Sequence, residues 1–197
     1  LPPPQPHPTS SKREENPMMT LATKTRHKCF ISYHHDDEQE VKQFIDTFDH
    51  SHDIFIANGI GAGLPGDIIN SNNSDYIMQQ IRERYLRTTT VTIVMIGEET
   101  WGRKFVDWEI AASLRNTKTT TASGLLAISL PSVQYYSDLQ IPARLRDNID
   151  GNRGYARWWR YPSNSDALAH FIEIAYSNRT QKDYLRDNSR ILRQRNA

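Results

Sequence analysis

The chain contains one cysteine, Cys29, among its 197 residues. A single cysteine excludes an internal disulfide and is typical of proteins that work in a reducing cytoplasm. Cys29 stands in the apolar run KCFISY, which favours a small core residue over a catalytic thiol. We therefore expect a cytoplasmic protein whose stability comes from its hydrophobic core.

Long hydrophobic runs and an excess of charge of either sign are also missing. No stretch approaches the roughly 20 apolar residues of a membrane-spanning helix. The Pro-rich N-terminus has no apolar region of the kind found in signal peptides. The 24 Lys and Arg against 23 Asp and Glu leave a formal net charge of +1. This balance gives no reason to expect binding to nucleic acid or to a membrane surface.

Composition divides the chain into three parts. Residues 1–26 are rich in proline and polar residues, and we expect them to be disordered. Residues 27–178 carry regular apolar patterns and are expected to form one domain. Basic residues outnumber acidic ones in residues 179–197, which we expect to be a basic helix or tail. For this part a solvated helix is favoured over an arm that contacts the domain.

Several catalytic motifs are missing or stand in an unfavourable context. The chain has neither a G-x-S-x-G nucleophile elbow nor a G-x-x-x-x-G-K-[ST] phosphate loop. It has G-x-G-x-x-G at residues 61–66, but no amphipathic helix opens at the last glycine, so a loop able to act as a lid is favoured over a dinucleotide-binding turn. Metal-ligating groups stand together in the run HHDD at residues 34–37. Because neighbouring side chains in a loop point in different directions, and no second cluster has ligand spacing, we expect a polar loop and no metal site.

Short β-type runs alternate with helical periodicity from residue 27 onward. Strands are expected at residues 27–33, 53–57, 90–97, 124–130 and 155–162, the last at an edge of the sheet. Helices are expected at residues 38–48, 74–87 with Ser74 as the N-cap, 100–116 and 166–176. This alternation predicts an α/β domain with a parallel sheet, whose ligands bind at the carboxyl ends of the strands. A receiver-like domain is disfavoured, because its phosphorylated aspartate is missing from the end of the third strand.

An acidic residue interrupts the apolar face of the expected helix at residues 100–116. At about 100° per residue, this face is a broad arc made of Trp101, Phe105, Val106, Trp108, Ile110 and Ala112. Glu109 projects from within the arc, whereas Lys104, Asp107 and Arg115 fall on the opposite face. Burying an unpaired carboxylate is costly. Glu109 is therefore either paired with an arginine, capped by a neighbouring loop, or used in chemistry, and the residues alone leave these alternatives open.

The ordered set of these features resembles the Toll/interleukin-1 receptor (TIR) family. It is most similar to the TIR-like branch typified by the Thoeris antiphage signalling protein ThsB. The matching segments are residues 29–33, 73–76, 90–97 and 100–114. The resemblance implies a flavodoxin-like, TIR-like three-layer fold with a central, mostly parallel five-stranded sheet and helices on both faces. Two positions depart from the family pattern, since Phe105 replaces a usual Trp and Ala57 replaces a frequent acidic residue.

The resemblance also implies an activity. Enzymes of this family cleave the bond between nicotinamide and ribose in NAD, and their catalytic glutamate falls on Glu109. NAD would then be a substrate and not a resident cofactor, no metal would be required, and the product would be a linear or cyclic ADP-ribose signal in antiviral defence. Cleavage of this bond passes through an oxocarbenium-like state, as in glycoside hydrolysis. A carboxylate in a mostly apolar pocket is suited to stabilise that positive charge.

Further residues and partners follow from the same resemblance. The residues expected to bind NAD are Ser32, Tyr33 and His34 at the rim, Asn58 in the loop after the second strand, and Phe105 and Trp108 framing the pocket. A homo-oligomer is expected, together with a separate effector that the diffusible product reaches. The alternative is a non-enzymatic TIR-like interaction module, in which Glu109 would form a structural ion pair and the loops would bind partner domains.

Overall fold

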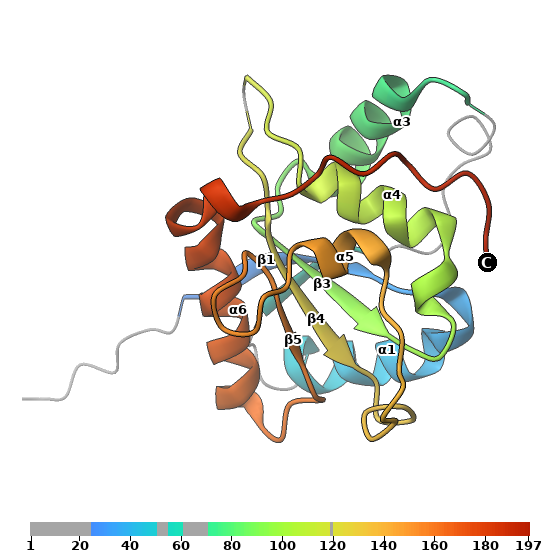
Figure 1. Cartoon of the computed structure of the whole chain (residues 1–197). Helices are drawn as coiled ribbons and strands as arrows, with labels where there is room; N and C mark the ends of the chain where they lie inside the picture. Colours follow the sequence, from blue (N-terminus) through green and yellow to red (C-terminus); the bar gives the residue numbers. More distant parts are fainter. Residues whose placement is uncertain (1–24, 51–54, 61–70, 119) are drawn as a thin grey trace, which may run out of the picture.

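The computed structural model describes residues 25–50, 55–60, 71–118 and 120–197 (Figure 1). Almost all of the segment expected to be disordered, residues 1–26, lies outside this part, as does the G-x-G-x-x-G sequence at residues 61–66. In the described part, no helix combines the length and the apolar character that crossing a membrane requires.

A five-stranded sheet forms the centre of the domain. Its strands are β1 (His27–Ser32), β2 (Phe55–Ile60), β3 (Val91–Ile96), β4 (Gly124–Ser129) and β5 (Arg157–Trp159). They lie in the order β2-β1-β3-β4-β5, and each neighbouring pair is parallel. Every residue of β3 and β4 is buried, because helices cover both faces of these central strands. The expected parallel five-stranded sheet, with its last strand at an edge, is confirmed.

Helices cover the sheet on both faces and complete a three-layer α/β fold (Figure 1). On one face α1 (Glu38–Ile45) and α6 (Ser165–Gln181) pack on the strands through a core cluster that includes Phe44, Ile172 and Ile93. On the other face lie α3 (Ser74–Ile81), α4 (Lys104–Ser113) and α5 (Ala143–Asp147). The flavodoxin-like, TIR-like architecture that the sequence predicts is therefore the observed one.

Three local predictions differ from the structure. Strand β2 runs on to Ile60, so Asn58 lies within the strand and not in the loop after it. The helix expected from residue 100 is divided into a 3-10 turn, Thr100–Gly102, and α4, because the backbone of Arg103 is extended. The N-cap of α3 is Asn73 and not the next residue, since its side-chain oxygen accepts hydrogen bonds from two backbone N–H groups at the start of the helix.

The end of the chain does not form the solvated helix that the sequence favours. Residues 182–197, here called the C-terminal segment, contain one short 3-10 turn and then run across α4 and α5 (Figure 1, dark red). The backbone N–H of Arg193 donates to Asp107 Oδ2 at 2.8 Å, and Asn188 Nδ2 donates to the carbonyl oxygen of Ala111 at 2.9 Å. The segment is thus a contact arm, the alternative that the sequence disfavoured.

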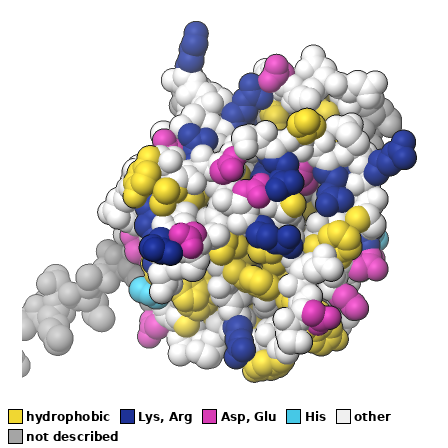
Figure 2. All heavy atoms as spheres, in the orientation of Figure 1, with side chains coloured by type: hydrophobic (Ala, Val, Ile, Leu, Met, Phe, Trp, Pro, Cys, Tyr) yellow, Lys and Arg dark blue, Asp and Glu magenta, His cyan; other side chains and the backbone are white. Residues whose placement is uncertain are grey.

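Charges of both signs lie side by side on the face that this segment covers. Figure 2 shows dark-blue and magenta side chains next to one another on this face. One such pair joins the C-terminal segment to α5, where Arg190 Nε lies 2.7 Å from Asp147 Oδ2. This ion pair adds to the hydrogen bonds that hold the C-terminal segment against the domain.

Candidate active site

The carboxylate of Glu109 lies at the carboxyl end of β1. Ser32 is the last residue of that strand, and its hydroxyl donates a hydrogen bond to Glu109 Oε2 at 2.6 Å. Side chains alternate along a strand, and Phe30 packs against α3 and α4, so Ser32 points toward the same helices. Glu109 is 2% exposed and Ser32 is fully buried. Strand β1 and helix α4 together enclose the acidic group at the sheet edge where ligands of such folds bind.

Burial raises the pKa of Glu109 to about 8, and the hydrogen bond from Ser32 opposes this shift. Among the described residues, no Lys, Arg or His lies within ion-pairing distance of this carboxylate. The structural ion pair that the sequence left open is therefore not formed within the described part of the chain. A buried, unpaired carboxyl group with a strongly raised pKa is typical of functional sites.

The turn of α4 that carries Glu109 is fixed by a second polar contact. Ser113 Oγ donates to the backbone carbonyl oxygen of Glu109 at 2.8 Å and lies 2.8 Å from the hydroxyl of Thr92 on β3. This contact ties the helix to the sheet and sets the position of Glu109. Ser113 was not identified from the sequence. Its position four residues after Glu109 could have indicated it, because a serine in a helix often donates to the backbone carbonyl oxygen four residues earlier.

The strength of the Ser32 hydrogen bond can be measured through the acidity of Glu109. We expect Ser32→Ala to raise the pKa of Glu109 further, by about one unit, because a hydrogen bond to a charged group is lost. The titration of the Glu109 carboxyl carbon, followed by NMR in the isotope-labelled protein, reports this shift. Ser129→Ala is the matched control, since Ser129 is the buried last residue of β4. An unchanged Glu109 titration in Ser32→Ala would show that the hydrogen bond does not set its acidity.

Tyr33 and His34 continue the chain beyond Ser32. Tyr33 is buried, and its pKa is raised first by burial and then by the charges of Glu38 and Glu109. Tyr33 belongs to the core cluster on the face covered by α1 and α6, whereas Ser32 and Glu109 lie on the face covered by α3 and α4. His34 is also buried, and burial, together with the nearby charge of Arg103, lowers its pKa. The structure therefore brings Ser32 into contact with Glu109, while Tyr33 packs on the other face of the sheet and His34 has a different set of neighbours.

Comparison with known families identifies the domain. The profile of the Thoeris protein ThsB, TIR-like domain, matches residues 30–135, more than half of the chain. The chain belongs to this family. The match begins in β1 and includes Ser32 and Glu109. The protein is therefore a TIR-like protein of Thoeris antiphage defence. A search of curated proteins found no match.

Of the two aromatic residues expected to frame the NAD site, Phe105 lies one helical turn before Glu109 on α4 of the TIR-like domain, whereas Trp108 faces α3 and the C-terminal segment. Trp108 is 3% exposed and packs against α3, and its Nε1 donates to the carbonyl oxygen of Arg193 at 2.9 Å. Phe105 is partly buried with its ring centroid 5.9 Å from that of Trp108. Lys104 Nζ lies over both rings, 5.2 and 4.9 Å from their centroids. These contacts make Trp108 an anchor for the C-terminal segment, and the proposed role of both rings in binding NAD remains a prediction.

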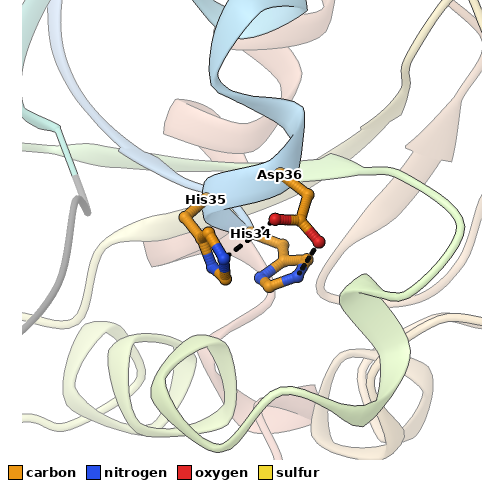
Figure 3. A group of neighbouring side chains, drawn as sticks. All are labelled: His34, His35 and Asp36. Carbon is orange, nitrogen blue, oxygen red and sulfur yellow. Dashed lines mark hydrogen bonds and ion pairs between the residues drawn. The ribbon is translucent and has the colours of Figure 1, made fainter.

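The polar loop after β1 differs from the expectation in one respect. His34, His35 and Asp36 do not point apart, because their side chains meet above the turn that leads into α1 (Figure 3). Asp36 Oδ2 lies 3.1 Å from His34 Nε2, and Asp36 Oδ1 lies 2.8 Å from His35 Nε2. One of the two reasons for which the sequence disfavoured a metal site at residues 34–37, that neighbouring side chains point apart, is therefore wrong.

Proposed function

We propose that this TIR-like protein cleaves NAD at the bond between nicotinamide and ribose, with Glu109 as the catalytic carboxylate. The observation that carries this proposal is the buried carboxyl group at the carboxyl end of β1, hydrogen-bonded to Ser32 at 2.6 Å and without a cationic partner among the described residues. In an interaction module, a buried carboxyl group in this state would add cost without a function.

The chemistry fits a single carboxylate. When the bond between ribose C1′ and the nicotinamide nitrogen breaks, its electron pair leaves with nicotinamide and neutralises the pyridinium charge. The positive charge that develops on the ribose is spread over C1′ and the ring oxygen. The ionised Glu109 stabilises this charge in surroundings from which water is excluded. Since the leaving group is already cationic in NAD, no strong general acid is needed.

The raised pKa of Glu109, about 8, has a consequence for substrate binding. In the free protein the neutral carboxylic acid predominates at neutral pH, whereas stabilisation of a cation requires the carboxylate. The pyridinium charge of NAD, placed close to Glu109, lowers this pKa and favours the ionised form. Because Glu109 is 2% exposed, its contact with substrate also requires movement of the side chains that cover it.

Ser32 orients the Glu109 carboxylate, and Tyr33 and His34 are proposed to contact the ribose or the phosphates from the rim. The product is a linear or cyclic ADP-ribose, released as a signal that a separate effector binds. NAD is consumed, so no resident cofactor takes part. We further propose that the enzyme acts in the cytoplasm as a homo-oligomer.

Nicotinamide release from NAD tests the proposal. Wild-type protein is expected to release nicotinamide, and Glu109→Gln is expected to reduce the rate on the order of 100-fold, as loss of one electrostatic contact to a transition state does elsewhere. The control is Glu98→Gln, which removes an exposed carboxylate just after β3 and should keep the wild-type rate. Release by Glu109→Gln at the wild-type rate would exclude Glu109 as the catalytic group. No release by concentrated wild-type protein, with or without lysate of phage-infected cells, would leave the interaction module as the function.

A further inference from the structure

Three metal-ligating groups meet at the turn between β1 and α1. The ring nitrogens of His34 and His35 and the carboxylate of Asp36 lie within 4.8 Å of one another. Figure 3 shows the two imidazole rings next to each other, with the Asp36 carboxylate facing and interacting with both. We propose that these three residues form a binding site for a divalent d-block cation, with Zn²⁺ as the first candidate. This site goes beyond the proposed cleavage of NAD, which needs no metal.

The donor set selects the class of cation. Two imidazole nitrogens and one carboxylate oxygen suit Zn²⁺, Cu²⁺ or Ni²⁺. Mg²⁺ and Ca²⁺ prefer oxygen ligands throughout, and so this set disfavours them. Three protein ligands leave one position of a tetrahedral Zn²⁺ site for water or for another small ligand.

A metal site requires the two exposed side chains to move, because the ligand atoms of the three residues are brought only to within 4.8 Å of one another. With metal–ligand distances of about 2.0–2.2 Å, the ligand atoms of a tetrahedral site lie roughly 3.3–3.5 Å apart. The carboxylate oxygens of Asp36 are already 3.1 and 2.8 Å from the two imidazole nitrogens. The side chains of His35 and Asp36 are 78% and 64% exposed and are able to move, whereas that of His34 is 7% exposed and fixes one ligand in place.

The surrounding charge favours a cation. Carboxylates are concentrated in the first turns after β1, on Asp36, Asp37, Glu38 and Glu40. Asp37 Oδ2 accepts a hydrogen bond from the hydroxyl of Thr100, so this carboxylate is directed toward the loop after β3 and contributes its charge without being a ligand. Two of the surrounding charges are already paired, since Lys42 forms an ion pair with Glu38 and Arg103 forms one with Glu99, which leaves Asp36, Asp37 and Glu40. The net charge around the three ligands is therefore negative.

The same three side chains also satisfy one another without a metal. Each imidazole nitrogen that faces Asp36 must then carry a proton and donate it to the carboxylate. A cation replaces these two contacts with three coordination bonds; a neutral imidazole then carries its proton on the other ring nitrogen, and an imidazolium releases one proton. The metal-free and metal-bound arrangements predict different results when a cation is titrated into the protein. This titration does not depend on whether the protein cleaves NAD.

Direct titration with Co²⁺ and Zn²⁺ distinguishes the two states. Full-length protein without an affinity tag, freed of metal by chelation, is titrated with Co²⁺ while the visible absorption of tetrahedral Co²⁺ is recorded, and Zn²⁺ is then added as a competitor. We expect one Co²⁺ per chain, displaced by Zn²⁺. Since loss of an outer-shell partner alone weakens metal sites 10- to 100-fold, we expect His35→Ala and Asp36→Asn each to weaken binding at least tenfold.

The controls locate the cation and separate ligand loss from unfolding. His170→Ala removes an exposed histidine on α6 and should bind as wild type does. Circular dichroism of His35→Ala and Asp36→Asn should match that of wild type, because both side chains are largely exposed. The proposal is overturned if wild type does not bind Co²⁺, or if both variants bind it with wild-type affinity, which would place the cation on other histidines of the chain. The readout is the absorption of bound Co²⁺ and not nicotinamide release, so this test can fail or succeed independently of the test of NAD cleavage.

Discussion

Replacing Glu109 with glutamine is expected to remove a large pH dependence from the stability of the fold. The carboxyl group titrates at about 8 in the folded protein, against a usual value of 4.5, because burial penalises its charged form. Between these two values the unfolded chain is ionised at this position while the folded protein keeps its proton. Unfolding therefore releases a proton, and the free energy of unfolding falls by about 1.4 kcal/mol per pH unit.

The sign and the window follow from the raised pKa. Below pH 4.5 the group is protonated in both states and its contribution to stability is fully present. The contribution is lost as the pH rises to about 8, and above that value the dependence ends. Glu109→Gln cannot ionise, so its stability relative to wild type should increase across this window by on the order of 5 kcal/mol in total.

Urea unfolding at several pH values between about 5 and 8 measures this effect. The quantity to follow is the difference in the free energy of unfolding between Glu109→Gln and wild type, because its slope with pH is independent of the packing cost of the substitution. The exposed variant Glu98→Gln should give a difference that does not vary with pH. If the difference for Glu109→Gln is equally flat, Glu109 is ionised in the folded protein, and the argument for an unpaired buried carboxyl group fails.

The position of Glu109 was predictable because local patterns determine it. The apolar run at residues 90–97 matches β3, and the helical periodicity after residue 100 gave the correct register for α4, in which Glu109 is buried between apolar neighbours. Parallel strands joined by helices bring their carboxyl ends to one edge of the sheet. The end of β1 was thus expected near Glu109, and the contact between Ser32 and Glu109 follows that geometry.

Features that depend on distant parts of the chain were not predictable from periodicity. Asp107 falls on the polar side of its helix in the sequence pattern, yet it is 4% exposed. The reason is the C-terminal segment, whose Arg193 lies 86 residues further along the chain and donates its backbone N–H to that carboxylate. The spacing of residues in the sequence predicts which face of a helix a side chain lies on. It does not predict whether a distant segment of the chain covers that face. The contact between the side chains of His34, His35 and Asp36 was not predicted either. Residues in a short turn follow no regular periodicity, so the sequence does not indicate where their side chains point.

Breaking the ion pair beneath the C-terminal segment is expected to destabilise the protein strongly. Arg144 of α5 and Asp107 of α4 have side chains only 1% and 6% exposed. Arg144 Nε donates to Asp107 Oδ1 at 3.0 Å and Nη2 donates to Asp107 Oδ2 at 3.3 Å. The same guanidinium donates to Asn188 Oδ1 at 2.9 Å and to the carbonyl oxygen of Ile191 at 3.2 Å, so one buried charge joins two helices and the C-terminal segment.

Asp107→Ala leaves this guanidinium buried without its counter-charge. Removing one partner of a buried ion pair costs about 3–5 kcal/mol, and we expect a loss of that size in urea unfolding. Limited proteolysis should also cut the C-terminal segment faster, because the variant loses the acceptor for the N–H of Arg193. The matched control is Asp150→Ala, which breaks the pair of Asp150 with Arg153, whose side chains are 69% and 85% exposed, and should cost no more than about 1 kcal/mol.

A double variant separates the cost of an unpaired charge from the loss of packing. Asp107→Leu combined with Arg144→Met removes both buried charges and keeps apolar volume at both positions, so its loss of stability should be smaller than that of Asp107→Ala. If the double variant is as unstable as the single one, packing and the neutral hydrogen bonds to the C-terminal segment dominate. If Asp107→Ala is as stable as wild type, the guanidinium is not held in a buried site. The C-terminal segment would then not be fixed to α4 through this pair, and its contacts would not contribute to holding the helix that carries Glu109.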